Sequence, residues 1–306
     1  PLPGFSYEDI SECEQQLQKL SQILKNIEVG NDFDSLENFT AKKNLFPSVK
    51  FGLEQCLINL SAISNNNIFQ NKFGLKKKEI PVNAVIGVGE KLDTISEIEK
   101  KVKAGFNTIK IKLSGVNIDA DINLIDSIRK FFGKEINLRL DLNGAWDKKN
   151  ALGNIEYFLP FGIQYIEEPC GFIDSIMDVA KKSKVPVAVD ESMNSVSDLL
   201  SVIKSSTIQY IVLKPMITTG IFSAVKLIDE ANKKNKKIIL SSSFESAVGK
   251  SALVFLASLV KHDLAQGLDT GSHFKTNICA DPFSADGGKI LFDPALYPPK
   301  INLLIK

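Results

Sequence analysis

Residues 137–146, N-L-R-L-D-L-N-G-A-W, place three polar side chains on one face of a predicted strand. Side chains alternate between the two faces of a strand, so the leucines share one face and Arg139, Asp141 and Asn143 share the other. Three successive polar residues on a buried face are costly unless they have partners or bind a ligand. Asp141 lies at the carboxyl end of the strand, where parallel-sheet enzymes carry catalytic groups. This stretch alone leaves open an edge strand with a solvated face.

Polar residues also end most of the other predicted strands. They are Lys110 and Lys112, Glu167 and Glu168, Asp190 and Glu191, Lys214, and the segments 241–246 (S-S-S-F-E-S) and 267–270 (G-L-D-T). Taken singly, a lysine in a strand usually faces solvent, and an aspartate after a strand usually caps the next helix. Taken together, carboxylates on three consecutive strands, with lysines on the strands at either side, are expected to converge on one point.

Such a cluster points to metal-assisted chemistry. Neighbouring carboxylates repel and raise one another's pKa, and a hard divalent cation removes that cost. Mg²⁺ suits one carboxylate from each of several strands, with water and substrate oxygens completing its shell. Beside this cation Lys112 is expected to shift toward its neutral form and to take a proton alpha to a carboxylate, giving a metal-stabilised enediolate. Lys214, from the opposite side, is expected to be a second acid/base or a fixed cation.

The composition excludes several other classes of function. The chain has 306 residues, of which 44% are hydrophobic and 24% charged, and its net charge of +1 gives no sign of nucleic-acid or anionic-lipid binding. It shows no signal peptide, no long apolar run and no C-x-x-C spacing, so we expect a cytoplasmic protein with free thiols. His262 and His273 do not follow strands in a triad-like setting, which argues against a Ser-His-Asp hydrolase and a histidine-bound metal.

Short apolar strands alternate with amphipathic helices from residue 80 onward, which indicates a parallel sheet. The predicted strands span 81–86, 108–113, 137–142, 163–167, 186–190, 209–213, 237–241 and 265–269. The predicted helices span 93–104, 120–132, 148–158, 172–183, 195–204, 219–235 and 248–260. A count close to eight favours a closed (β/α) TIM-type barrel. An open dinucleotide-binding sheet is disfavoured, since the glycines at 87 and 89 lack the third glycine and the acidic partner of that motif.

Two further helices, over 7–28 and 48–63, are predicted before this region, and the second is apolar enough to lie between two bodies. The lysines at 76–78 are interpreted as a solvated connector. The tail from residue 286 contains a hairpin-like G-G-K-I-L-F and ends in the apolar I-N-L-L-I. We expect it to return and pack elsewhere on the protein.

The order K-x-K, D-x-N, E-E-P, D-E-S, K-P along successive strands resembles the enolase superfamily, in its muconate-lactonising-enzyme-like subgroup. Finer motifs resemble the o-succinylbenzoate synthase family of menaquinone biosynthesis: P-L-P-G-F-S (1–6), P-S-V-K-F-G-L-E (47–54), R-L-D-L-N-G-A-W (139–146), I-E-E-P-C (166–170), S-S-S-F-E-S (241–246) and G-L-D-T (267–270). The ordered set spans nearly the whole chain and is more specific than any one motif. It implies an enolase-type barrel with an α+β capping domain and Mg²⁺ as cofactor, with Mn²⁺ as a substitute ion.

The resemblance also implies residue roles. Asp141, Glu167 and Asp190 would hold Mg²⁺, Lys112 would take the alpha proton and return it to the departing hydroxyl, and Lys214 would face the ring as a cation. The remaining assignments are Lys110 and Asn143 around the substrate, Ser241 and the backbone at Gly267 and Leu268 at its succinyl carboxylate, and Arg139 and Glu168 as supporting residues. The implied reaction dehydrates 2-succinyl-6-hydroxy-2,4-cyclohexadiene-1-carboxylate to o-succinylbenzoate, which gains an aromatic ring.

Members of this family begin with strands of the capping domain, and the P-L-P-G-F-S opening matches a position after those strands. We therefore expect a partial cap over 1–78, the barrel over 79–285 and a tail over 286–306 that returns to the cap. A preceding segment that supplies the missing strands is favoured over a site that closes in another way.

Two other functions stay open. An N-succinylamino acid racemase or dipeptide epimerase of the same superfamily would use Lys112 and Lys214 as paired bases, although G-L-D-T stands where dipeptide epimerases tend to carry D-x-D. A barrel kept only as a scaffold is disfavoured by its intact acids and lysines. The expected partner is a small-molecule carboxylate, with no nucleic acid or membrane partner, in a monomer or a homodimer.

Overall fold

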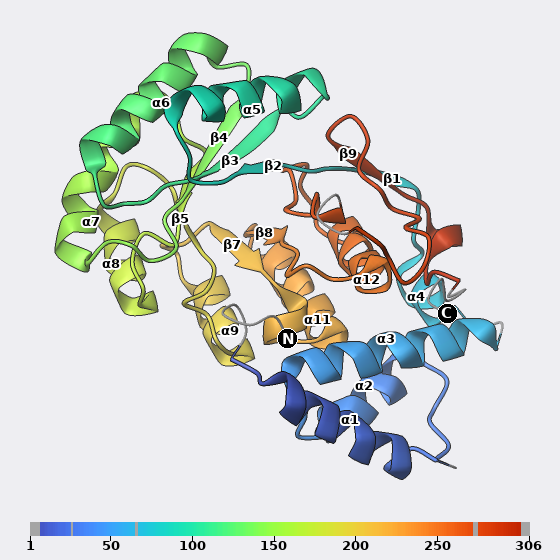
Figure 1. The fold of residues 1–306 in the computed structure, drawn as a ribbon. Helices are drawn as coiled ribbons and strands as arrows, with labels where there is room; N and C mark the ends of the chain where they lie inside the picture. Colours follow the sequence, from blue (N-terminus) through green and yellow to red (C-terminus); the bar gives the residue numbers. More distant parts are fainter. Residues whose placement is uncertain (1–6, 26, 65–66, 272–274, 301–306) are drawn as a thin grey trace.

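The computed structural model describes residues 7–25, 27–64, 67–271 and 275–300. Within these ranges, seven parallel strands form one curved sheet in chain order (Figure 1). They are β2 (Ala84–Ile86), β3 (Thr108–Lys112), β4 (Asn137–Asp141), β5 (Tyr165–Glu167), β6 (Val187–Val189), β7 (Tyr210–Leu213) and β8 (Lys237–Leu240). The predicted turn-rich opening at 1–6, the apolar end at 301–305 and His273 lie outside the described residues.

Two isolated parallel bridges bring the ends of this sheet together. One joins Ser241, just after β8, to Gly267, and the other joins Gln266 to Val82, just before β2. Residues 266 and 267 therefore stand where the eighth strand was predicted, although they form bridges and not a full strand. The architecture confirms the predicted (β/α) barrel of TIM type.

Helices follow the strands and cover the outside of the sheet (Figure 1). They are α5 (Lys91–Lys103), α6 (Ile118–Phe132), α7 (Lys148–Asn154), the 3-10 helix η1 (Ile155–Phe161), α8 (Ile173–Lys182), α9 (Val196–Lys204), α10 (Pro215–Thr218), α11 (Ile221–Lys233) and α12 (Ala247–Ser258). The helix predicted over 148–158 is divided, and Pro160, which has no N–H, lies in its 3-10 part. The helix predicted from 219 begins at Ile221, because Gly220 has a left-handed φ of 77°.

Strand β4 lies inside the sheet and not at its edge. It pairs with β3 on one side and β5 on the other, so the edge-strand alternative is wrong. Leu138 and Leu140 are fully buried in the main apolar core, and Arg139 and Asp141 are at most 1% exposed. Since strand side chains alternate, the two charged residues share the opposite face, toward the barrel interior. A separate apolar cluster is formed by one residue from each of the strands β5 to β8: Tyr165, Ala188, Val212 and Ile239.

Four helices from the beginning of the chain lie beside the barrel (Figure 1). They are α1 (Ile10–Ile23), α2 (Phe33–Ala41), α3 (Pro47–Ile63) and α4 (Ile68–Phe73). The helix predicted over 7–28 is shorter than expected, since Asp9 caps its start and it ends at Ile23; α2 was not predicted. Helix α3 is confirmed, and it contacts α1 and α2 as well as α10 and α11, as expected of a helix between two bodies.

The strand predicted over 81–86 is split in two. Pro81 ends a separate strand, β1 (Lys78–Pro81), and residues 84–86 form β2. Strand β1 pairs antiparallel with β9 (Lys289–Phe292), so the lysine connector runs into a strand and the G-G-K-I-L-F segment has a distant partner. A last 3-10 helix, η3 (Pro294–Leu296), follows β9. The amides of Asn59 in α3 and Asn67 before α4 donate to the carbonyls of Pro299 and Tyr297, each at 3.2 Å, which ties the tail to these helices.

No helix within the described ranges is long and apolar enough to span a membrane. The division into a partial cap, a barrel and a returning tail stays a prediction.

Candidate active site

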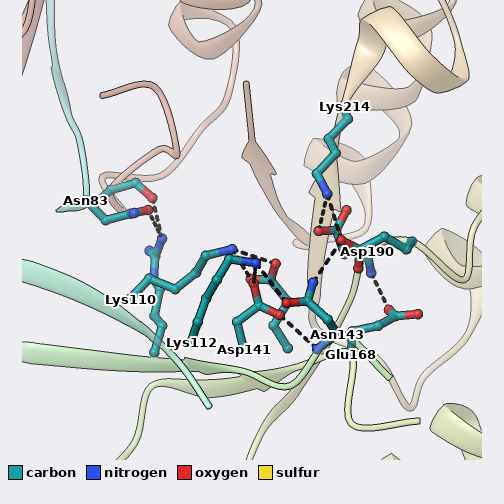
Figure 2. Close-up of polar contacts among 12 residues, drawn as sticks. Asn83, Lys110, Lys112, Asp141, Asn143, Glu168, Asp190 and Lys214 are labelled. Carbon is teal, nitrogen blue, oxygen red and sulfur yellow. Dashed lines mark hydrogen bonds and ion pairs between the residues drawn. The ribbon is translucent and has the colours of Figure 1, made fainter. Parts of the chain in front are cut away.

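A row of charged residues crosses the carboxyl ends of adjacent strands. The register places Lys112 beside Asp141 and Asp141 beside Glu167, and Asp190 directly follows β6. Asp141, Glu167 and Asp190 are each at most 5% exposed. The three acids predicted from the sequence therefore lie at the carboxyl ends of three consecutive strands, as expected. Figure 2 shows Lys110 and Lys112 beside Asp141, and Lys214 beside Asp190.

Lys110 binds two of these acids at once. Its Nζ lies 3.0 Å from Asp141 Oδ2 and 2.8 Å from Glu167 Oε1. Burial alone would lower the pKa of Lys110, but the charges of Glu167, Asp141 and Asp190 outweigh it and raise that pKa well above its ordinary value. Burial likewise opposes ionisation of Asp141, and Lys110 with Lys112 overcomes it and lowers the pKa of that carboxyl. Lys110 is thus a fixed positive charge between two carboxylates.

The other two lysines reach the acids from different sides (Figure 2). Lys112 Nζ lies 3.4 Å from Asp141 Oδ2, whereas Lys214 Nζ donates to Asp190 Oδ2 at 2.5 Å. Burial would lower the pKa of Lys214, but the charges of Asp190 and Glu191 outweigh it and raise that pKa. Lys112 and Lys214 therefore flank the acids, which is the placement that the sequence predicts, and their catalytic roles stay predictions.

Two residues at the mouth of this cluster join the flanking lysines. Lys112 donates to Asn143 Oδ1 at 2.8 Å, and Asn143 Nδ2 donates to Glu191 Oε1 at 3.1 Å. Lys214 donates to the same Glu191 oxygen at 3.1 Å. Asn143 was predicted to face substrate, and that role stays a prediction. No role was predicted for Glu191, because its sequence position beside Asp190 in D-E-S is also what a solvated loop residue shows.

Glu168 fixes the segment that carries Asp190. Its carboxylate accepts hydrogen bonds from the backbone N–H groups of Asp190 and Ser192, both at 2.7 Å, and its own φ of 47° is left-handed. Burial raises the pKa of Glu168 to about 7 against these hydrogen bonds, and the charge of Glu191 adds to the effect. The second glutamate of E-E-P thus shapes the loop next to the acids.

Arg139 lies deeper in the barrel and contacts none of the three acids within salt-bridge distance among the described residues. It donates to Gln164 Oε1 at 2.7 Å, to Asn83 Oδ1 at 3.0 Å and to the Ala265 carbonyl at 2.8 Å. Its guanidinium also lies 4.9 Å from the centre of the Tyr165 ring. Asn83 precedes β2 and Ala265 precedes the bridge residue 266, so Arg139 ties β4 to both sides of the barrel closure.

The residues predicted to hold a second carboxylate of the substrate lie at the last strands. Ser241 and Gly267 pair in a bridge, and a Cβ on Gly267 would meet Ser241 Oγ at 3.1 Å, so a side chain there would crowd the serine. Leu268 is fully buried. Their substrate-binding role stays a prediction.

The acids have the chemistry of a magnesium site, but they are paired with lysines here. Among the described residues no group of three or more His, Cys, Asp and Glu side chains stands arranged to hold a metal ion. Glu167 Oε2 is buried without a hydrogen-bond partner, and carboxylate oxygens are the donors that Mg²⁺ prefers. The donor set therefore fits a hard divalent cation, whose binding would compete with Lys110 and Lys214 for carboxylate oxygens.

The sequence is similar to those of several known proteins. The chain is 27% identical to an o-succinylbenzoate synthase from Desulfotalea psychrophila, over 92% of this chain and 74% of that protein. It is 31% identical to an o-succinylbenzoate synthase from Thermobifida fusca, over 66% of this chain and 63% of that protein. It is also 26% identical to an N-succinyl-L-Arg/Lys racemase from Bacillus cereus, over 67% of this chain and 57% of that protein. The chain thus spans less than two thirds of the last two relatives.

Solved structures share the fold. MenC from Desulfotalea psychrophila superimposes with a TM-score of 0.81 at 24% identity, over 95% of this chain and 89% of that chain. A dipeptide epimerase from Methylococcus capsulatus, solved in complex with a Mg ion, has a TM-score of 0.82 at 18% identity, over 96% of this chain and 86% of that chain. Residues 93–295, about two thirds of the chain, match the family model described as enolase C-terminal domain-like. The chain therefore belongs to the enolase C-terminal domain-like family.

Proposed function

We propose that this protein is a Mg²⁺-dependent lyase that converts 2-succinyl-6-hydroxy-2,4-cyclohexadiene-1-carboxylate to o-succinylbenzoate. The observation that carries the proposal is the placement of Lys112 and Lys214 on two flanks of three buried carboxylates at the ends of consecutive strands. The match over 92% of the chain to a relative named o-succinylbenzoate synthase supports this choice of reaction within the family.

Asp141, Glu167 and Asp190 are the residues that would hold the ion, since they are buried and come from three adjacent strands. A divalent cation at these oxygens neutralises negative charge that develops on the substrate carboxylate. Lys110, between Asp141 and Glu167, keeps positive charge at the same place. The site is thus suited to a carboxylate substrate that gains negative charge during the reaction.

Lys112 is the proposed base. The side chain of Lys112 is 36% exposed, whereas the three acids are at most 5% exposed, so a neutral Lys112 would be accessible to a substrate carbon. Lys112 would take the proton from the carbon alpha to the carboxylate, and the electrons of that bond would become the new double bond. The C–O bond to the ring hydroxyl then breaks, and the proton on Lys112 leaves with that oxygen as water.

Lys214 would stay protonated in this reaction and face the ring as a cation. Its contact with Asp190 and Glu191 raises its pKa, which favours the charged form. A second candidate function uses the same residue differently. Because Lys214 and Lys112 reach the acids from different sides, they could exchange protons on two faces of one carbon, as a racemase of N-succinylamino acids requires, and the Bacillus cereus relative is named for such a reaction.

Ultraviolet detection of o-succinylbenzoate, with and without a chelator, tests the proposal. We expect product to form with Mg²⁺ and to fall to background when the chelator is present. Absence of product with Mg²⁺ would contradict the lyase assignment. Exchange of the alpha hydrogen of both enantiomers of an N-succinylamino acid in D₂O, without dehydration of the first substrate, would instead identify the racemase.

A further inference from the structure

A continuous chain of hydrogen bonds links the two lysines that flank the acids. It runs from Lys112 Nζ to Asn143 Oδ1, from Asn143 Nδ2 to Glu191 Oε1, and from Lys214 Nζ to the same Glu191 oxygen. The three distances are 2.8, 3.1 and 3.1 Å, which are those of ordinary hydrogen bonds. Lys112 ends β3 and Lys214 directly follows β7, so this series of hydrogen bonds crosses the mouth of the barrel.

Both polar atoms of the Asn143 side chain are hydrogen-bonded. Its oxygen accepts from an ammonium group and its nitrogen donates to a carboxylate, so only one orientation of the amide satisfies both partners. The backbone fixes this placement, because Asn143 has a left-handed φ of 43° and its N–H donates to Asp141 Oδ1 at 3.1 Å. Gly144 follows with a φ of 77°, and a Cβ there would meet Gly171 Cα at 3.1 Å.

Glu191 accepts both hydrogen bonds at one end of this network, from Asn143 and from Lys214. Its side chain is 42% exposed, whereas that of Lys214 is 17% exposed, so Glu191 holds a more buried ammonium group from the solvent side. Lys214 also binds Asp190, one of the proposed metal ligands. A cation that competes for Asp190 would leave Glu191 as the anion that still restrains Lys214.

We propose that Glu191 is a positioning residue that couples Lys214 to Lys112 through Asn143. Loss of its carboxylate frees Asn143 Nδ2 and removes one of the two carboxylates that Lys214 contacts, so the effect reaches Lys112 although Glu191 does not touch it. The coupling is a property of these side chains, and its importance for turnover rests on the function proposed above.

Competitive labelling of lysines tests the coupling without a substrate. The metal-free protein is treated with a trace of acetic anhydride at fixed pH, and mass spectrometry compares Lys112 and Lys214 with the exposed Lys181. Acetic anhydride reacts with the neutral amine, so a lysine whose ammonium form loses hydrogen-bond support is labelled faster. Glu191→Ala removes one acceptor from Lys214 and releases the Asn143 amide that accepts from Lys112, so we expect labelling of both lysines to rise by about threefold. In an Asn143→Ala background the same substitution is expected to leave Lys112 unchanged and still affect Lys214.

The exposed Glu97 supplies a matched control, since Glu97→Gln removes a carboxylate elsewhere on the barrel. Circular dichroism checks the fold of each variant, and Glu191→Gln, which keeps the size of the side chain, serves if Glu191→Ala does not fold. Unchanged labelling of Lys112 in a folded Glu191 variant overturns the coupling. If Glu191→Ala changes the labelling of Lys112 equally in the wild-type and Asn143→Ala backgrounds, the coupling does not pass through Asn143.

Turnover and metal binding separate this inference from the proposed function. If the wild type dehydrates the substrate, Glu191→Ala should lower kcat by about tenfold with KM within twofold, and Glu191→Asp should restore part of the loss. Its Mg²⁺ affinity, measured by calorimetry, should stay within about twofold, because Glu191 is not a proposed ligand. If the wild type shows no turnover but Glu191→Ala still changes the labelling of Lys112, the lyase assignment is refuted and the coupling stands.

Discussion

The carboxylate of Glu54 accepts a hydrogen bond from the backbone N–H of Ile221, which joins helix α3 to the first turn of α11. It also accepts from the N–H of Phe222 at 3.2 Å and from the hydroxyl of Thr40 at 3.1 Å. A Cβ on Gly220 would come within 2.6 Å of this carboxylate, so only glycine fits beneath it. Since α10 and Gly220 follow Lys214 directly, the contact anchors the segment next to that lysine.

We expect the Glu54 contact to make stability depend on pH. Burial raises the pKa of Glu54 from 4.5 to about 7, and this outweighs Lys50 and the hydrogen bonds. Because the folded-state pKa is above the unfolded one, its contribution is fully present below pH 4.5 and is lost as pH rises through 7. The loss is on the order of 3 kcal/mol in the free energy of unfolding.

Urea unfolding of wild type and Glu54→Gln between pH 4.5 and 8 checks this expectation. The glutamine keeps an acceptor for the two N–H groups but cannot ionise, so its free energy of unfolding should fall less over that range. Glu14→Gln, at an exposed position of α1, is the control and should follow the wild type. Equal pH slopes for wild type and Glu54→Gln would show that the carboxyl does not remain buried as described.

Arg139 should be needed for the barrel more than for the reaction. Arg139→Met leaves the oxygens of Asn83, Gln164 and Ala265 without their donor, which should cost about 3–5 kcal/mol of stability. Arg139→Lys should cost less, because an ammonium group can still serve part of the set, and Lys181→Met on the surface should change little. Denaturant midpoints measure the three variants, and an unaltered midpoint for Arg139→Met would mean that the closure does not depend on it.

The acids could be predicted from the sequence because local rules decide their position. The two-residue period of a strand put Asp141 on the inner face, and the alternation of strands and helices put Glu167 and Asp190 at the same end of the barrel. The split of the strand predicted over 81–86 could not be predicted in this way. It depends on the pairing of β1 with β9, about 200 residues away, and the local sequence pattern does not indicate that partner.

The hydrogen-bond and salt-bridge partners of the site lysines also could not be predicted from the sequence. The pattern K-x-K predicts two inward lysines, but it does not tell that Lys110 lies between two acids whereas Lys112 reaches Asn143. The role of Glu191 depends on the left-handed backbone of Asn143, an unusual conformation for a residue other than glycine. Helix α2 was missed because it has nine residues, too few for a strong periodic signal.

Asp190→Asn should weaken Mg²⁺ binding. It removes one of three proposed carboxylate ligands, so the affinity should fall by at least about tenfold. Binding to the folded state raises stability by about 2.7 kcal/mol at an ion concentration 100 times Kd, so the Mg²⁺-dependent shift in Tm should shrink in the variant. Calorimetry gives the affinity directly, with Asp174→Asn as the control, and an affinity equal to that of the wild type would remove Asp190 from the ligand set.

Lys112→Ala should abolish dehydration and leave the metal site nearly intact. The alpha proton then has no base within reach, and loss of a general base costs about 10²–10⁴-fold in rate. Lys112 lies 3.4 Å from Asp141 but is not a proposed ligand, so calorimetry should give a Mg²⁺ affinity close to that of the wild type. Exchange of the alpha hydrogen in D₂O should stop together with dehydration, because both need the same proton transfer. Substantial turnover in the variant, with wild-type metal affinity, would assign the base to another residue, and Lys214→Ala measured alongside would show whether it is the lysine on the other flank.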